Sequence, residues 1–177
     1  MKTLIDHLAQ YAAYHRDRRN IASHFIGIPL IVVAVAVLLS RPGVSLLGMW
    51  CSPALLMAGA AALFYWRLDL RFGVLMSALL GLCLWAGASL AQSATAVWLG
   101  WGLGLFVLGW IIQFVGHYYE GRKPAFVDDL MGLAVGPLFV VAELGFLLGL
   151  RDEVRRAVEE RAGPTRRRDL GAGKSAQ

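Results

Sequence analysis

Four long apolar runs limit what this chain can fold into. They cover residues 46–66, 72–91, 94–115 and 130–150, and each approaches or exceeds the roughly 20 residues that a helix needs to cross a bilayer. The 177 residues are 58% hydrophobic, and their mean hydropathy of +0.59 is too high for a water-soluble domain of this size. Because backbone groups inside a bilayer must be hydrogen-bonded within the protein, the runs predict an all-α, polytopic integral membrane helical bundle.

The amino-terminal region predicts an amphipathic helix on the membrane surface. Residues 2–24 lack the early apolar stretch of a cleavable signal peptide, while apolar side chains such as Leu4 and Leu8 recur at helical spacing. A shorter apolar run, 25–40, carries Pro29 near its start. This run either spans with some bilayer thinning or begins in the interface.

Positive charges between the runs predict the orientation of the chain. With a cytoplasmic amino terminus, the first four loops place only Arg41 outside among their lysines and arginines. Five full crossings would nevertheless place the basic segment after Leu150 outside. Pro137 and Glu143 interrupt the last run, so we hypothesise that 130–150 re-enters the membrane or is buried against other helices and returns the tail to the cytoplasm.

We therefore expect one membrane-embedded domain, residues 1–150, followed by a basic, disordered carboxyl-terminal tail, residues 151–177. Most of the formal net charge of +5 comes from this tail. A basic segment beside a membrane favours anionic lipid headgroups, and no nucleic-acid motif accompanies the charge. Cys51 and Cys83 lie inside apolar runs and predict neither a disulfide framework nor a metal site.

A polar stripe ends the third full-length run. At about 100° per residue, Gln113, His117 and Glu120 fall within a narrow sector of one helix face. The spacing of His117 and Glu120 suits joint coordination of a divalent metal. Glu120 is also open to a plainer reading, as a loop carboxylate paired with Arg122 or Lys123.

Two further histidines lie on the same side of the membrane as this stripe in the predicted topology. His15 and His24 flank Asn20, and nine residues place them on nearly opposite faces of an uninterrupted helix. If both bind one ion, the chain must bend between them, either near Asn20 or between the surface helix and the first crossing. His7 is better explained by the polar face of the surface helix.

These residue types indicate a metal site without fixing the metal. Two or three imidazoles with a carboxylate and open positions suit non-haem Fe(II), and zinc accepts the same ligands. Glu143, well inside an apolar run, either supports the site or has a structural partner. Asp128 and Asp129 precede the last run and are read as its cap.

The candidate site residues lie within two longer sequence motifs. The patterns H-x4-N-x3-H-x2-G-x-P and Q-x2-G-H-x2-E-x3-P-A begin at His15 and Gln113, and GPLFVVAELGFLLG follows later in the chain. Across roughly residues 8–150 the sequence resembles the family of small multi-pass membrane proteins that includes the fungal endoplasmic-reticulum 2-hydroxy fatty acid dioxygenase. The resemblance implies Fe(II)-dependent α-oxidation, in which O₂ cleaves the bond between C1 and C2 of a 2-hydroxy fatty acid and shortens it by one carbon.

With this resemblance we expect a membrane-bound enzyme whose partners are a 2-hydroxy fatty acid, O₂ and membrane lipid. His15, His24 and His117 are the expected ligands, Glu120 is a further ligand or the carboxylate that orients an imidazole, and Gln113 and Asn20 are polar support. The expected location is the bacterial inner membrane, or the endoplasmic reticulum in a eukaryote. A zinc-dependent lipid hydrolase using Glu120 as general base and a non-enzymatic membrane scaffold or carrier remain alternatives. Chain length, stereochemistry, the fate of the released carbon and the oligomeric state are not predicted.

Overall fold

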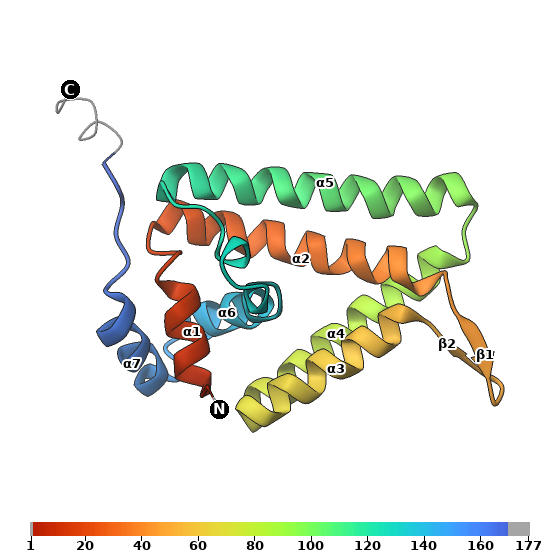
Figure 1. Cartoon of the computed structure of the whole chain (residues 1–177), viewed down its shortest axis with the longest axis horizontal. Helices are drawn as coiled ribbons and strands as arrows, with labels where there is room; N and C mark the ends of the chain where they lie inside the picture. The colour runs from red at the N-terminus through yellow and green to blue at the C-terminus, as the bar shows by residue number, and fades with distance from the viewer. Residues whose placement is uncertain (1, 170–177) are drawn as a thin grey trace. The chain divides into compact units, whose positions relative to one another are not determined.

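The chain is helical throughout most of the part that its computed structural model describes, residues 2–169 (Figure 1). The elements are α1 (Leu4–Ala12), α2 (Arg18–Ser40), β1 (Val44–Leu46), β2 (Met49–Cys51), α3 (Pro53–Leu68), α4 (Leu70–Ala91), α5 (Thr95–Glu120), the 3₁₀ helix η1 (Ala125–Val127), α6 (Met131–Leu147) and α7 (Asp152–Ala162). The only sheet among the described residues is the β1–β2 hairpin. The predicted all-α class is confirmed.

Three of these helices are long and apolar enough to cross a membrane: α2 with 23 residues, α4 with 22 and α5 with 26. Helix α3 is apolar but has only 16 residues, because the hairpin takes up the first part of the predicted run 46–66. Helices α6 and α7 qualify only as a pair, and they are bent by 116° at the break between them. The predicted membrane bundle is therefore present, with one predicted span shorter than expected.

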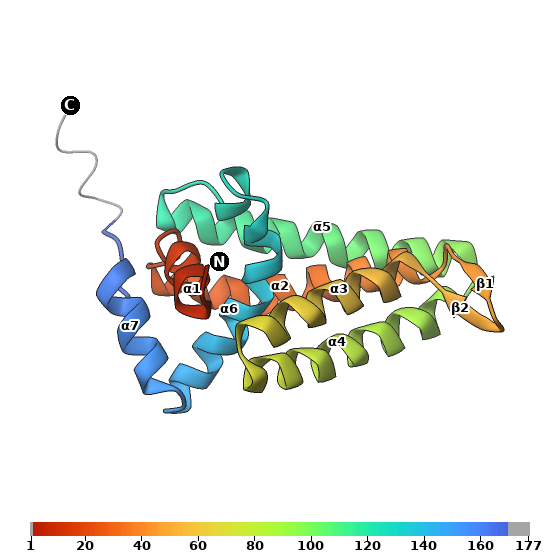
Figure 2. The ribbon, with the colours of Figure 1, turned by 60° about the horizontal axis from the view of Figure 1, so that its bottom comes forward.

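The described chain divides into two compact units, and the second unit consists of residues 27–110. Within it, α3 and α4 form an antiparallel hairpin that reverses at Asp69 (Figure 2). Asp69 ends α3, and its carboxylate then accepts a hydrogen bond from the Phe72 amide at the start of α4. A Cβ on Gly73 would lie 2.8 Å from the Trp66 backbone, so only glycine permits this approach of the two helices.

The first unit contains residues 1–26 and 111–177, and here α1 packs against both α6 and α7. Helix α1 starts with a capping box, in which Thr3 and Asp6 satisfy each other's backbone amides. Its apolar face, with Leu4 and Leu8, is buried, as the sequence pattern predicts. Helix α6 buries seven residues in spite of Pro137, against five in α1.

Two expectations about the ends of the chain need correction. The single helix predicted within residues 2–24 is two helices in the structure. Helix α1 ends at Ala12, and residues 18–24 belong to the long helix α2. The tail expected to be disordered contains α7, whose Val154 and Val158 are buried, and this apolar pair was hidden among charged residues in the sequence. The end GAGKSAQ lies outside the described residues, and the division at residue 150 stays a prediction, as does the membrane side of the tail.

Candidate metal centre

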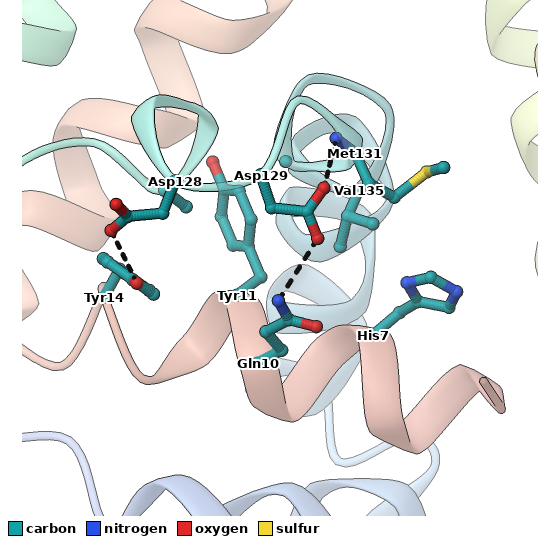
Figure 3. A pocket seen from close by; sticks show the side chains of 10 residues that line it. His7, Gln10, Tyr11, Tyr14, Asp128, Asp129, Met131 and Val135 are labelled. Atoms are coloured by element: carbon teal, nitrogen blue, oxygen red, sulfur yellow. Dashed lines mark hydrogen bonds between the residues drawn. The ribbon is translucent and has the colours of Figure 1, made fainter.

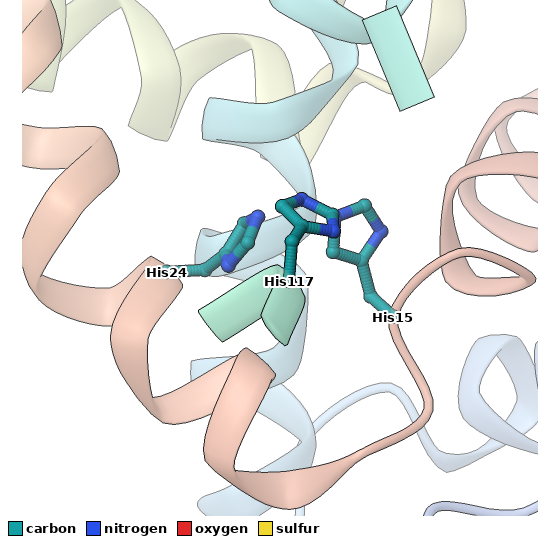
Figure 4. A group of neighbouring side chains, drawn as sticks. All are labelled: His15, His24 and His117. Carbon is teal, nitrogen blue, oxygen red and sulfur yellow. The ribbon is translucent and has the colours of Figure 1, made fainter. Parts of the chain in front are cut away.

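Three histidines from separate parts of the chain meet inside the first unit (Figure 4). His15 lies in the connector between α1 and α2, His24 lies in the first turns of α2, and His117 lies in the last turn of α5. One nitrogen from each ring lies within 4.8 Å of the others, and all three side chains are buried. The required bend is present, and it lies at residues 13–17, between the surface helix and the first long helix.

Hydrogen bonds orient two of the three rings. His15 Nδ1 is 2.7 Å from the Tyr11 carbonyl oxygen, and His24 Nδ1 is 2.8 Å from the Asn20 carbonyl oxygen. A carbonyl oxygen only accepts, so both Nδ1 atoms donate and both Nε2 atoms keep their lone pairs. This is the arrangement by which proteins fix the tautomer of a metal-binding histidine.

Unpartnered nitrogen atoms support the fit of a metal ion at this position. Within the described part of the chain, His15 Nε2 and His117 Nδ1 are buried without a hydrogen-bond partner. Burial is the main cause that holds the pKa of His15 well below its ordinary value, so its imidazole is neutral. A neutral ring with a free lone pair is the form that binds a divalent metal.

Aromatic side chains cover the His15 side of the cluster. The Tyr11 ring is stacked on the His15 ring, with 4.1 Å between centroids and 7° between planes. Phe139 of α6 contacts both rings, at 5.0 Å from Tyr11 and 5.7 Å from His15. Sequence reasoning missed Tyr11 as part of the site, although its position four residues before His15 on the apolar face of α1 was visible.

Glu120 is buried beside the cluster but lies outside the group of three histidines. Its Oε2 accepts three hydrogen bonds, from the amides of Arg16 and Asp17 at 2.9 and 2.7 Å and from Asn20 Nδ2 at 3.1 Å. The carboxylate therefore holds the connector that carries His15. The alternative pairing with Arg122 or Lys123 is wrong, because Arg122 donates to the Ala13 carbonyl and Lys123 pairs with Asp128.

Gln113 and Asn20 are buried with Glu120, so the predicted polar stripe does face the interior. Asn20 Nδ2 is used by Glu120, whereas Asn20 Oδ1 and Gln113 Nε2 are without a partner among the described residues. Gly116 makes room for this arrangement, since a Cβ there would lie 2.6 Å from Asn20 Oδ1. The two amides thus leave one acceptor and one donor unused in a buried region, which water or a bound ligand would satisfy.

Glu143 has a structural partner. Its Oε1 lies 3.6 Å from an Arg16 guanidinium nitrogen, and both side chains are largely buried. Arg16 also donates from Nε to the Ala12 and His15 carbonyls. Glu143 is therefore linked to the histidines through Arg16 and is not itself one of the three clustered groups.

The remaining candidate residues lie elsewhere. His7 lines a small pocket together with Tyr11, Asp128 and Asp129 (Figure 3). Asp129 accepts from the Met131 amide at the start of α6, as a cap would, whereas Asp128 accepts from the Tyr14 hydroxyl. Cys51 and Cys83 are both free.

The comparisons with known proteins agree with this geometry. The sequence model of the family described as "2-hydroxy-palmitic acid dioxygenase Mpo1-like" matches residues 1–148. The chain is 31% identical over 154 residues to the 2-hydroxy-palmitic acid dioxygenase MPO1 of Saccharomyces cerevisiae, covering 86% of this chain and 85% of that protein. No solved structure matches. The clustered histidines, the apolar helices and these matches together show that the chain belongs to the Mpo1-like family of 2-hydroxy-palmitic acid dioxygenases.

Proposed function

We propose that this protein is a membrane-bound, Fe(II)-dependent dioxygenase that shortens 2-hydroxy fatty acids by one carbon. The observation that carries the proposal is the cluster of His15, His24 and His117, with ligand atoms within 4.8 Å of one another. Three neutral nitrogen ligands leave coordination positions open, which O₂ and a substrate require. Fe(II) held there supplies redox chemistry with O₂ that no side chain provides.

The residues around the cluster have roles that follow from their contacts. The Tyr11 and Asn20 carbonyls accept hydrogen bonds from Nδ1 of His15 and His24. They thereby keep both rings in the tautomer that leaves the Nε2 lone pair free. We assign Glu120 to positioning rather than ligation, because it lies outside the group of close ligand atoms and its Oε2 accepts three hydrogen bonds from the connector and Asn20. Among the described residues, Gln113 Nε2 is a buried amide donor without a hydrogen-bond partner, and we assign it to a substrate oxygen.

The source of the substrate follows from the surroundings. The long helices expose many large apolar side chains, as surfaces solvated by lipid do, so an acyl chain can reach the protein from the membrane. The bacterial inner membrane stays the predicted location.

The zinc-dependent hydrolase is less well supported. Zinc accepts three histidines, but hydrolysis also needs a general base within reach of the attacked water. Glu120 was the candidate base, but it lies outside the group of three histidines, and its Oε2 is occupied by the amides of Arg16 and Asp17 and by Asn20.

Metal analysis and product analysis test the proposal together. Protein purified anaerobically in detergent should retain Fe(II), and adding O₂ with a defined 2-hydroxy fatty acid should give the acid one carbon shorter, identified by mass spectrometry. With one O₂ and no added reductant, the reaction balances when C1 leaves as CO₂ together with one water. Protein that binds only zinc and consumes no O₂ would contradict the proposal.

A further inference from the structure

His15 differs from the other two clustered histidines in how its backbone is held. His24 and His117 lie within helices, where backbone hydrogen bonds fix their positions. His15 lies in the connector at residues 13–17, which has no helical ladder. A metal ligand on such a segment keeps its position only if other parts of the protein hold the segment.

One side of the connector is held by Glu120, which accepts from the Arg16 and Asp17 amides. The carbonyl of Arg16 and the amide of Arg18 both form hydrogen bonds with a segment near the carboxyl-terminal end of the chain. Arg166 donates its amide to the Arg16 carbonyl at 2.8 Å, and its carbonyl accepts from the Arg18 amide at 2.9 Å. Asp17 and Arg166 therefore pair as in a parallel sheet.

Side chains extend this pairing along residues 163–168, which we name the strap. Arg16 donates from its guanidinium to the Gly163 carbonyl at 2.8 Å. The buried Asp17 carboxylate accepts from the Arg168 amide at 2.7 Å, and Arg19 donates to the Arg168 carbonyl at 2.7 Å. The strap thus contacts the connector at both of its ends and in its middle.

Helix α7 positions the strap beside the connector. It packs against α1 with Val154 and Val158 buried, and Arg161 in its last turn pairs with Asp6 of α1. Gly163, with a φ of 81°, then turns the chain from the helix into the strap. Helix α7 and the strap both follow residue 148, where the match to the family model ends.

We infer that the strap, residues 163–168, is a positioning element that holds the His15 connector against Glu120 and thereby keeps His15 in the metal site. The inference rests on the proposed function insofar as the three histidines bind a metal. Without the strap, the connector keeps its hydrogen bonds to Glu120 and Arg122 but loses those to Arg166 and Arg168, so His15 loses part of the order that ligation needs. Loss of such supporting contacts typically weakens metal binding about 10–100-fold.

Two truncations test the inference, with Co(II) as the probe because it replaces Fe(II) without oxidation in air. A chain ending at Ala162 keeps α7 and loses the strap, and a chain ending at Asp169 keeps both. Full-length protein and the longer truncation should bind Co(II) equally in a chelator competition. The shorter one should retain the helical circular dichroism and bind Co(II) about 10–100-fold more weakly, with altered visible absorption bands.

Point variants decide the matter even if the shorter truncation fails to fold. Arg166→Pro removes the amide that donates to the Arg16 carbonyl, while Arg166→Ala keeps that amide and removes the side-chain charge. Arg167→Pro is the matched control, because the Arg167 amide makes no hydrogen bond within the part of the chain that the structure describes. Only Arg166→Pro should weaken Co(II) binding.

The two possible failures are distinguishable. Full-length protein that binds no Co(II) would overturn the metal site and the role of the strap with it. Full-length protein that binds Co(II), with Arg166→Pro and Arg167→Pro equal in affinity, would overturn the strap alone and leave the metal site standing.

Discussion

The two units of this protein differ in the polar side chains that they bury. The unit with the histidines buries eight polar or charged residues among those described, namely His15, Arg16, Asp17, Asn20, His24, Gln113, His117 and Glu120, whereas the unit of residues 27–110 buries only Ser40 and Ser52. In the second unit, Leu82 and Trp85 of α4 are 62% and 72% exposed. Exposed apolar side chains thus mark the surface suited to lipid, while the proposed metal site lies where polar groups are buried.

The comparison also explains how each unit is held together. Exposed apolar side chains on α4 are stable because lipid is as apolar as a protein core. Buried polar groups need partners, and Glu120 illustrates this with three donors on a single oxygen. Changes to the first unit should therefore act on metal binding, and changes to the second on membrane insertion.

Removing a clustered histidine should have the largest effect. His117→Ala deletes one of three ligands, so we expect metal affinity to fall by more than about 100-fold and product formation to be lost, since even residues that only support a ligand account for about 10–100-fold. Metal content after dialysis and mass spectrometry of the product measure both. His7→Ala is the matched control, because His7 lines the separate pocket beside Tyr11. If His117→Ala kept its full metal content, His117 would not be a metal ligand, and the polar interior of the first unit would not be a metal site.

A charge on the apolar surface of the second unit should have the next largest effect. Leu82 lies near the middle of α4, so Leu82→Arg should impair insertion by about 2.5–3.5 kcal/mol, the cost of arginine at the centre of a membrane helix. The fraction of protein integrated into membranes is the measurement. Gln92→Arg, at the end of the same helix, is the control and should insert normally. Equal insertion of the two variants would show that α4 does not face lipid.

The positioning role of Glu120 should give a smaller change in the first unit. Glu120→Ala leaves the amides of Arg16 and Asp17 buried without their acceptor, so the connector should loosen and metal affinity should fall about 10–100-fold. Glu120→Gln keeps an oxygen that accepts, and it should lose less. If Glu120→Gln abolishes metal binding as fully as His117→Ala, the carboxylate is a ligand and the division between ligand and support is wrong. Chelator competition with Co(II) separates these outcomes.

Local spacing predicted a good part of the site and the fold. The spacing of Gln113, His117 and Glu120 placed them on one buried face, and the opposite phases of His15 and His24 required the bend that the structure has. Both arguments use the geometry of a helix, which sequence reveals directly. Apolar runs likewise predicted the long helices, although the hairpin shortened α3.

What the sequence did not predict depends on contacts between distant residues. The strap pairs with the connector through backbone amides and carbonyls about 150 positions apart, and such groups look the same in every residue. The sequence does not reveal the burial of Arg16 and Asp17, because their partners, Glu143 and residues 163–168, lie far along the chain. A charged segment with two valines at helical spacing was the signal available for α7.

The smallest effect concerns the junction of α1 and α7, where the exposed side chains of Asp6 and Arg161 pair. Hydrogen bonds from the Thr3 amide and hydroxyl and then from Arg161 lower the pKa of Asp6 from 3.8 to about 2. A carboxyl group whose pKa is lower in the folded state stabilises that state above its unfolded pKa and loses this effect as the pH falls through the folded value. Thermal unfolding in detergent should therefore show Asp6→Asn less stable than the natural chain above about pH 4, with the difference vanishing near pH 2. Because acid titrates every other carboxylate equally in both proteins, their difference isolates Asp6. A difference that persists below pH 2 would mean that Asp6 stabilises the junction of α1 and α7 through packing rather than through its charge.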